Sequence, residues 1–338
     1  MSRLSFFIKR LMRLDWQRFS KTFQKLKATT GKSAPVLLFD LLVCGVKYNA
    51  GYMDYLIARM DLLDSKQRKT VITRGISNNI VRRMNDKNYW HIFDDKQQFN
   101  QTFARWVKRQ SMRFDKNTGL EELKDFLQDK ESVFVKPIEG SSGVGVHKLS
   151  GEQIQNVEEV FSHLKDLGVS IVEETVIQHE RLQALCPTSV NTVRVATLLG
   201  DYKEGIVYAF LRVGNGQVMD NVDCGGMAAR INLEDGVITT PAADKQGNVF
   251  EKHPMTGTPF VGFTLPYFDE AKTMCLEAMR VVPQLRFVAW DVAITPDGPV
   301  FIEGNSFPSH AVPQFAAHYP DGIGILPEFE KFIDVYAK

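Results

Sequence analysis

The sequence has few cysteines, no long apolar run and almost no excess charge, and each shortage excludes a class of protein. The four cysteines are scattered and form no Cys-x-x-Cys pair, which argues against a zinc site or a disulfide framework and fits a reducing cytosol. No apolar run approaches the roughly 20 residues of a membrane span, and the N-terminus lacks a signal-peptide pattern. The net charge of +1 does not indicate nucleic acid as a partner. We therefore expect a cytoplasmic protein with a packed core and two or three domains.

Positive charge is nevertheless concentrated in the first 30 residues, which carry eight lysines and arginines against a single acid, Asp15. Apolar residues recur among them at near-helical spacing, from Leu4 to Trp16. The pattern predicts a basic amphipathic helix, which has two interpretations. The helix either lies on an anionic membrane surface, as a peripheral contact at the inner face of the membrane, or packs on the protein with its lysines in solvent.

The segment from Ala289 to Asn305 predicts a β-hairpin that holds a metal ion. Two apolar runs flank Pro296-Asp297-Gly298, which is typical of a three-residue hairpin loop with a bulge. In that register Asp291 lies opposite Glu303, and Asn305 shares a face with Glu303. Two carboxylates and an amide oxygen suit Mg²⁺ rather than Zn²⁺. The alternative is an exposed hairpin with solvated acids.

A glycine-rich loop follows a short apolar strand that ends in Lys136. Its residues are Gly140, Ser141, Ser142, Gly143 and Gly145. Closely spaced glycines let backbone N–H groups approach an anion, and the lysine supplies a point charge for phosphate. No Gly-Lys-Ser/Thr ends the loop and no helix follows it directly, so it is neither a P-loop nor a Rossmann fingerprint. A plain mobile turn is the alternative for this loop alone, but the metal hairpin downstream favours a nucleotide site.

Together these segments resemble the ATP-grasp superfamily, and most closely its sugar-transfer-associated branch. The motifs follow in order: Asp95-Lys96, the strand 134–136 with its glycine loop, Ile171–Glu180, Asn191–Val195, Asp220-Asn221, Gly225-Gly226, His253–Gly257, Trp290-Asp291 and Glu303-Gly-Asn305. The resemblance implies that ATP and Mg²⁺ are the cofactors and that ATP lies between two β-rich subdomains.

The resemblance also assigns roles to residues. Lys96 and Lys136 would contact the ATP phosphates, and the glycine loop would close over them. The segment Glu173, Glu174, Thr175 and Val176 would form the hinge strand beside adenine, largely through backbone groups. Glu180 would bind ribose. Asp291, Glu303 and Asn305 would hold Mg²⁺.

One position departs from the pattern of D-alanine–D-alanine ligase-like members, which carry an arginine two residues before the first metal-binding acid. Ala289 stands there in this sequence. Arg194 or Arg212, on neighbouring predicted strands, would supply the missing charge, and the sequence leaves open which one. His253, in the loop-rich stretch 220–257, is either an acid–base or substrate contact or an exposed loop residue.

The expected fold class is α+β, an ATP-grasp fold with a mostly helical N-terminal region. The domains are a basic helix over 1–30, a mainly helical domain over 31–130, a small subdomain over 131–180 and a large subdomain with the Mg²⁺ site over 181–338. Periodicity predicts helices over 96–107, 152–167 with Gly168 as its cap, and 268–281. It predicts strands over 193–199 and 206–213 and a short strand over Val71–Thr73.

The expected activity is that of a carboxylate–amine ligase working through an acyl phosphate on small-molecule substrates. The branch resemblance suggests a sugar acid, or an amino acid attached to a glycan, in polysaccharide or glycoconjugate synthesis. Two alternatives remain, a kinase that phosphorylates a hydroxyl and a non-catalytic nucleotide-binding scaffold.

Overall fold

The computed structural model describes residues 15–140, 145–216 and 220–337. Residues 1–14 of the predicted basic helix, and Ser141, Ser142 and Gly143 of the glycine loop, lie outside these ranges. The helices are α2 (Trp16–Thr30), α3 (Ala34–Lys47), α4 (Tyr52–Ile57), α5 (Arg74–Met84), α6 (His91–Asp94), α7 (Lys96–Thr102), α8 (Ala104–Val107), α9 (Leu120–Leu127), α10 (Glu152–Gln155), α11 (Val157–Leu167), α12 (Glu180–Leu185), α13 (Phe268–Ala278) and α14 (Leu326–Glu330).

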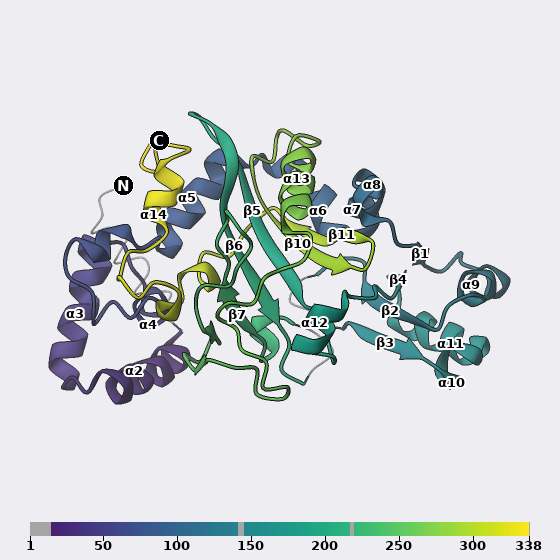
Figure 1. Cartoon of the computed structure of the whole chain (residues 1–338), viewed down its shortest axis with the longest axis horizontal. Helices are drawn as coiled ribbons and strands as arrows, with labels where there is room; N and C mark the ends of the chain where they lie inside the picture. The colour runs from purple at the N-terminus through teal and green to yellow at the C-terminus, as the bar shows by residue number, and fades with distance from the viewer. Residues whose placement is uncertain (1–14, 141–144, 217–219, 338) are drawn as a thin grey trace.

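The strands are β1 (Ser111–Phe114), β2 (Ser132–Pro137), β3 (His147–Ser150), β4 (Ser170–Glu174), β5 (Thr192–Leu199), β6 (Glu204–Val213), β7 (Met227–Arg230), β8 (Ala242–Ala243), β9 (Val249–Phe250), β10 (Phe287–Thr295) and β11 (Gly298–Asn305). Short 3₁₀ helices cover Gln67–Thr70, Lys87–Tyr89, Val222–Cys224, Val312–Gln314 and Ala316–His318. Figure 1 shows the long strands of the large sheet in the centre, the small sheet at one end and helices α2 to α4 at the other.

The small sheet has the antiparallel order β1-β4-β2-β3. Alternate residues of β2, Val133 and Val135, point into a core that also contains Leu123 of α9 and Leu164 of α11. The small sheet also contains β1, which lies before residue 131, the predicted start of the small subdomain. The predicted domain bounds stay a prediction.

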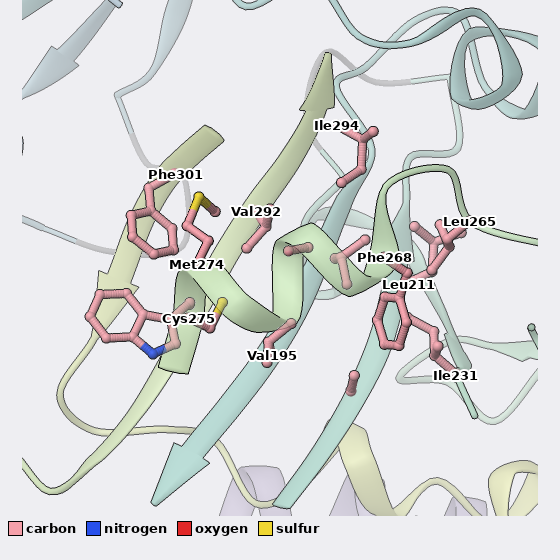
Figure 2. Packing of buried hydrophobic residues seen from close by; sticks show 14 of the residues in the cluster. Val195, Leu211, Ile231, Leu265, Phe268, Met274, Cys275, Val292, Ile294 and Phe301 are labelled. Atoms are coloured by element: carbon pink, nitrogen blue, oxygen red, sulfur yellow. The ribbon is translucent and has the colours of Figure 1, made fainter. Parts of the chain in front are cut away.

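The large sheet has the order β11-β10-β5-β6-β7-β8-β9 and is buried on both faces. One face packs against α13, where Val195 and Leu211 meet Phe268, Met274 and Cys275 (Figure 2). The opposite face packs against residues of α5, α14 and the C-terminal segment. The predicted strands over 193–199 and 206–213 are confirmed as β5 and β6, which pair antiparallel.

Aromatic side chains join helices α6 to α8 to the hairpin β10–β11. Phe103 lies 5.2 Å from the Trp290 ring, Phe93 lies 5.6 Å from it, and Trp290 stacks on Phe301 at 4.8 Å. The Trp290 indole N–H donates to Thr197 Oγ1 at 2.9 Å, so its polar group is satisfied in the core. This packing fixes α7, which begins at Lys96, against the edge strand β11.

The hairpin β10–β11 pairs Asp291 with Glu303, as predicted, but it reaches that register by another route. Thr295 pairs with Gly298 and not with the predicted Pro299, so the loop is one residue shorter. A register shift between Asp291 and Val292 then restores the predicted pair. The bulge lies beside the predicted metal ligands, a common position for bulges at functional sites.

The predicted strand over Val71–Thr73 is wrong. Its backbone is satisfied by a side chain, because Ile72 N–H donates to Gln314 Oε1 at 2.7 Å and Gln314 Nε2 donates back to the Ile72 carbonyl at 2.6 Å. One glutamine thus replaces a neighbouring strand, and the apolar run packs into the core without joining a sheet.

Two predicted helices are each divided. The helix over 96–107 breaks at Phe103 into α7 and α8, and the helix over 152–167 breaks at Asn156 into α10 and α11. Asn156 accepts the Glu159 N–H and so acts as the N-cap of α11. Gly168 ends α11 at φ 79°, as predicted.

The described part of the basic segment, α2, is helical as predicted. Within the described residues, no single helix is both long and apolar enough to cross a membrane. The pair α2 and α3 passes that test only when taken together, and it is bent by 111° at the break.

Candidate functional site

A cavity of about 410 Å³ lies between the small sheet, helices α6 and α7, and the end of β11. This volume is within the ~300–1,000 Å³ range of small-molecule sites. Six predicted site residues line it: Lys96, Lys136, Gly140, Glu173, Glu303 and Asn305. Residues from separate stretches of sequence therefore meet at one place.

Lys96 lines the cavity and is the first residue of α7. Asp95 caps that helix by accepting the Gln98 N–H at 2.9 Å, and Lys96 N–H donates to the Ile138 carbonyl at 3.1 Å. The Lys96 ammonium donates to the Gly140 carbonyl at 3.1 Å. Burial lowers the pKa of Lys96, and Lys136 lowers it further while Glu303 opposes the shift. A polyanion would relieve the repulsion between the two lysines.

Lys136, at the end of β2, is held by an ion pair with Glu173 of β4. The Glu173 carboxylate is almost completely buried and also accepts Arg109 Nη2 at 2.9 Å and Asn100 Nδ2 at 2.7 Å. Burial raises the pKa of Glu173, but Arg109 and Lys136 outweigh it and hold the pKa well below its usual range. The side chain of Glu173 thus orients a lysine of the cavity, a role not predicted from the sequence.

Arg109 is the main site residue that sequence reasoning missed. Its guanidinium donates to Glu173 on the small sheet and to the Phe301 and Ile302 carbonyls of β11, at 2.5 and 2.9 Å. It therefore ties the small sheet, which holds Lys136, to the strand that carries Glu303. Arg109 lies between a helix and a strand, in no recognisable motif, so the sequence offers no signal for it.

Asp291 and Glu303 lie side by side on β10 and β11. Position 289 carries alanine in place of the arginine of D-alanine–D-alanine ligase-like members, and here arginines of the neighbouring strands β5 and β6 approach Asp291 instead. Arg194 stands opposite Asp291 in the register of β5 and β10 and binds both of its carboxylate oxygens at 2.5 Å. Arg212 donates to Asp291 at 2.6 Å and to Asp220 at 2.7 Å. The sequence left open which of the two arginines supplies the charge, and in the structure both of them contact Asp291.

The acids of this cluster outnumber its bases, which favours binding of a cation. It contains three acids, Asp220, Asp291 and Glu303, and two bases, Arg194 and Arg212. Burial opposes ionisation of Asp291, but the two arginines hold its pKa well below the usual range. Burial raises the pKa of Glu303, and the adjacent Asp291 charge raises it further. A cation bound at Glu303 would remove this unfavourable pairing.

Asn305 supplies the second observation in favour of a metal. Its side-chain amide nitrogen is buried and has no hydrogen-bond partner among the described residues. Because a flip of the side chain exchanges the two ends of the amide, an unpaired amide at this position fits a carbonyl oxygen directed at an ion. Among the described residues no three His, Cys, Asp or Glu side chains form a metal cluster, so the set depends on this amide. Asp291, Glu303 and Asn305 thus fit Mg²⁺ by donor type, with Asp291 shared with the arginines.

Gly304 explains the spacing of Glu303 and Asn305. A Cβ at this position would lie 2.4 Å from Phe93 Cε1 and 2.8 Å from Phe99 Cε2. Only a residue without a side chain lets β11 lie flat on these rings while its two neighbours line the cavity.

Several predicted residues do not line the cavity. Glu174 accepts the Gln110 N–H, and Thr175 accepts the Ser132 hydroxyl, so both side chains fasten the small sheet. Val176 follows them, and Glu180 is exposed at the start of α12. Gly145 has φ 74° and faces Pro137. The adenine and ribose roles of this segment remain predictions.

His253 is buried, and its ring bonds to backbone at both ends. Nε2 lies 3.0 Å from the Gly214 carbonyl, and Nδ1 accepts the Met255 N–H at 3.3 Å. The expectation of an exposed loop histidine is wrong, and the structure does not bring His253 to the cavity. The hydrogen bond of Nε2 connects the segment around His253 to the segment around Gly214.

The sequence from residue 76 to residue 328, more than half of the chain, matches the model of the sugar-transfer associated ATP-grasp family. The chain belongs to this family. Membership confirms the ATP-grasp fold expected from the motifs, with ATP and Mg²⁺ as its cofactors.

Solved structures similar to this family member include three ligases. The D-alanine–D-alanine ligase from Coxiella burnetii is 12% identical, with 71% of this chain and 59% of that chain covered and a TM-score of 0.40. VanG D-Ala:D-Ser ligase from Enterococcus faecalis is 15% identical, with 70% and 60% covered and a TM-score of 0.44. The ATP-grasp ligase PsnB, complexed with a phosphomimetic precursor variant, Mg and ADP, is 14% identical, with 80% and 70% covered and a TM-score of 0.43.

The chain spans about six tenths of the length of the two D-alanyl ligases. No curated protein matches the sequence.

Proposed function

We propose that this protein is an ATP-dependent carboxylate–amine ligase that works through an acyl phosphate. The observation that carries the proposal is the convergence of Lys96, Lys136, Glu303 and Asn305 on one cavity, next to the Arg194–Asp291–Arg212 cluster. ATP with Mg²⁺ supplies the phosphoryl group and neutralises its charge. The chain's own residues would position that group and the acceptor.

In this proposal the two lysines hold phosphate oxygens. Lys136 is oriented by Glu173, and Lys96 by α7 and the Gly140 carbonyl, so neither side chain has to be ordered when nucleotide binds. Exclusion of water from the site would protect an acyl phosphate from hydrolysis.

The arginine cluster is suited to a carboxylate acceptor. Asp291 occupies the Nε and Nη2 groups of Arg194, and a guanidinium has five N–H donors, so Arg194 retains donors for a second anion. In the proposed reaction a carboxylate oxygen attacks the γ-phosphorus and ADP leaves. The amine then attacks the acyl carbon, loses a proton and displaces phosphate. A carboxylate is ionised at neutral pH and needs no general base.

The substrates we propose are a small sugar acid or a glycan-linked amino acid, together with an amine, in polysaccharide or glycoconjugate synthesis. This class follows from the description of the family alone. The cavity combines lysine, carboxylate and amide side chains with the apolar side chains of Phe93, Phe99 and Phe307.

The test is to incubate the protein with ATP, Mg²⁺ and panels of sugar acids, amino acids and amines. We expect ADP and free phosphate in equal amounts, a condensed product by mass spectrometry, and a hydroxamate when hydroxylamine replaces the amine. A phosphorylated product without free phosphate would replace the ligase with a kinase.

One observation favours that second function. Asp94 lines the cavity, and its partial desolvation raises its pKa, as does the adjacent charge of Glu139. A carboxylate with a raised pKa is a general base for a hydroxyl acceptor. If the protein is a kinase, Asp94→Asn should abolish turnover, whereas a ligase should retain most of its activity.

A further inference from the structure

Helix α3 turns the side chain of Asp40 toward the rest of the protein. Asp40, its single charged residue before the final Lys47, accepts the buried Tyr55 hydroxyl at 2.7 Å. The same carboxylate takes both terminal nitrogens of Arg68 at 2.7 and 3.0 Å, and Lys32 at 3.1 Å. A surface helix normally turns its charged residues toward solvent. These bonds fix α3 in the opposite orientation.

As a result, the large side chains of the outer face of α3 are apolar and exposed. Their exposed fractions are 54% for Val36, 42% for Leu38, 69% for Phe39, 48% for Leu42 and 43% for Val46. The helix forms the outer edge of the molecule, at the end opposite the small sheet (Figure 1). A run of exposed apolar side chains held in place by partly buried ion pairs marks a surface that meets an apolar partner.

The charge around α3 indicates what that partner is. The first 47 residues contain ten lysines and arginines against Asp15 and Asp40, a net charge of +8. The remaining residues contain 31 basic against 38 acidic residues, a net charge of −7. On α2, Arg18, Lys21 and Lys27 are exposed. A second copy of this chain would bring two such basic segments together, whereas an anionic surface would neutralise them.

We propose that the outer face of α3 docks on the surface of an anionic lipid bilayer, with α3 lying in the plane of the interface. Val36, Phe39, Leu42 and Val46 enter the acyl-chain boundary, and the exposed bases of α2 contact the headgroups. A 14-residue helix is about 21 Å long, against a hydrocarbon core of about 30 Å, so α3 lies on the membrane and does not span it.

The experiment measures co-sedimentation of the full-length protein with two kinds of vesicle, at low and high salt. One kind is phosphatidylcholine alone, and the other is phosphatidylcholine with about one third phosphatidylglycerol, which gives the surface a negative potential. We expect binding to the anionic vesicles that weakens at high salt and is at least about tenfold weaker on neutral vesicles. The variant Val36→Ser/Phe39→Ser/Leu42→Ser should lose about tenfold or more of this binding.

The matched control is Tyr202→Ser/Val261→Ser/Val281→Ser, which removes three exposed apolar side chains elsewhere and should bind like the native protein. Circular dichroism must show native melting for both variants, which is expected because every substituted side chain is exposed. Three results would overturn the proposal. The first is that the native protein does not sediment with anionic vesicles, and the second is that the α3 variant binds them as well as the native protein does. The third is that light scattering shows a dimer of the native protein and a monomer of the α3 variant, with no vesicle binding by either.

Discussion

Single residues behind the cavity determine how the two sheets are joined, and Arg109 is the clearest case. We predict that Arg109→Met lowers the free energy of unfolding by about 3 kcal/mol, because it leaves the buried Glu173 carboxylate with Lys136 as its single charged partner among the described residues. Glu173 would then hold Lys136 more tightly, and the affinity for ATP should fall. Urea unfolding and calorimetry with a non-hydrolysable ATP analogue measure the two effects.

A double variant separates the ion pair from the packing of Arg109. In Arg109→Met/Glu173→Gln the uncompensated charge is gone, so part of the lost stability should return. If the double variant is as unstable as the sum of the single variants, the two residues do not act together.

A second prediction for a single residue concerns Gly304. Gly304→Ala places a Cβ within 3 Å of Phe93 and Phe99 and should cost about 1–3 kcal/mol through overpacking. The displaced strand should also lose Mg²⁺-dependent nucleotide binding. Gly119→Ala is the control, since its Cβ would meet nothing within 4 Å and the cost there should stay below about 1 kcal/mol. Equal stability of both variants would show that β11 adapts freely.

The sequence predicted the residues of this site better than the contacts among them. The pairing of Asp291 with Glu303 was predicted from a three-residue loop, whereas the structure reaches it through a shorter loop and a bulge. A one-residue bulge leaves no pattern in the sequence, so this compensation could not be predicted. Arg109, Asn100 and Asp220 act through contacts between distant segments, which spacing along the chain cannot reveal.

At the scale of elements, the orientation of α3 depends on Asp40, and this dependence is testable by pH. Burial opposes ionisation of Asp40, but the hydrogen bonds from Arg68, Tyr55 and Lys32 lower its pKa to about 2. Because the folded pKa lies below the unfolded value near 3.8, the stabilisation is complete above about pH 4 and is lost as the pH falls through about 2.

We therefore predict that Asp40→Asn destabilises the protein by about 1 kcal/mol at pH 6, after allowance for solvent screening of a partly exposed group. The difference between the native protein and the variant should shrink between about pH 4 and pH 2. Urea unfolding of both proteins across that range measures it. A difference that is constant from pH 6 to pH 2 would show that the Asp40 charge does not hold α3.

Elements with strong periodicity were predicted, and elements whose backbone is satisfied by a side chain were not. The strands β5 and β6 are long apolar runs in the interior of a sheet, which the sequence shows directly. Val71–Thr73 has the same composition, but Gln314, far away in the sequence, occupies its hydrogen bonds. Asn156 divides α10 from α11 because its side chain caps a new helix.

For the whole molecule, the cavity lies where the small sheet and the large sheet meet, so a bound nucleotide would join them. Lys136 belongs to the small sheet, Glu303 to the large one, and Lys96 to the helices packed between them. A ligand that contacts all three binds the folded protein and not the unfolded chain. Its binding should therefore raise the free energy of unfolding of the entire molecule.

We predict that ATP with Mg²⁺, at about 100 times its dissociation constant, stabilises the protein by about 2.7 kcal/mol and raises its melting temperature by several degrees. Lys136→Met should reduce this shift with or without Mg²⁺, because in the proposed site the lysine contacts phosphate directly. Glu303→Gln should remove the additional shift that Mg²⁺ gives over ATP with a chelator, since it takes a charge from the cation and leaves the phosphate contacts intact. Lys272→Met, which removes a lysine of α13 that pairs with Asp269, is the matched control and should respond like the native protein. If Lys136→Met and Glu303→Gln both respond to ATP and Mg²⁺ as the native protein does, the nucleotide binds outside this cavity.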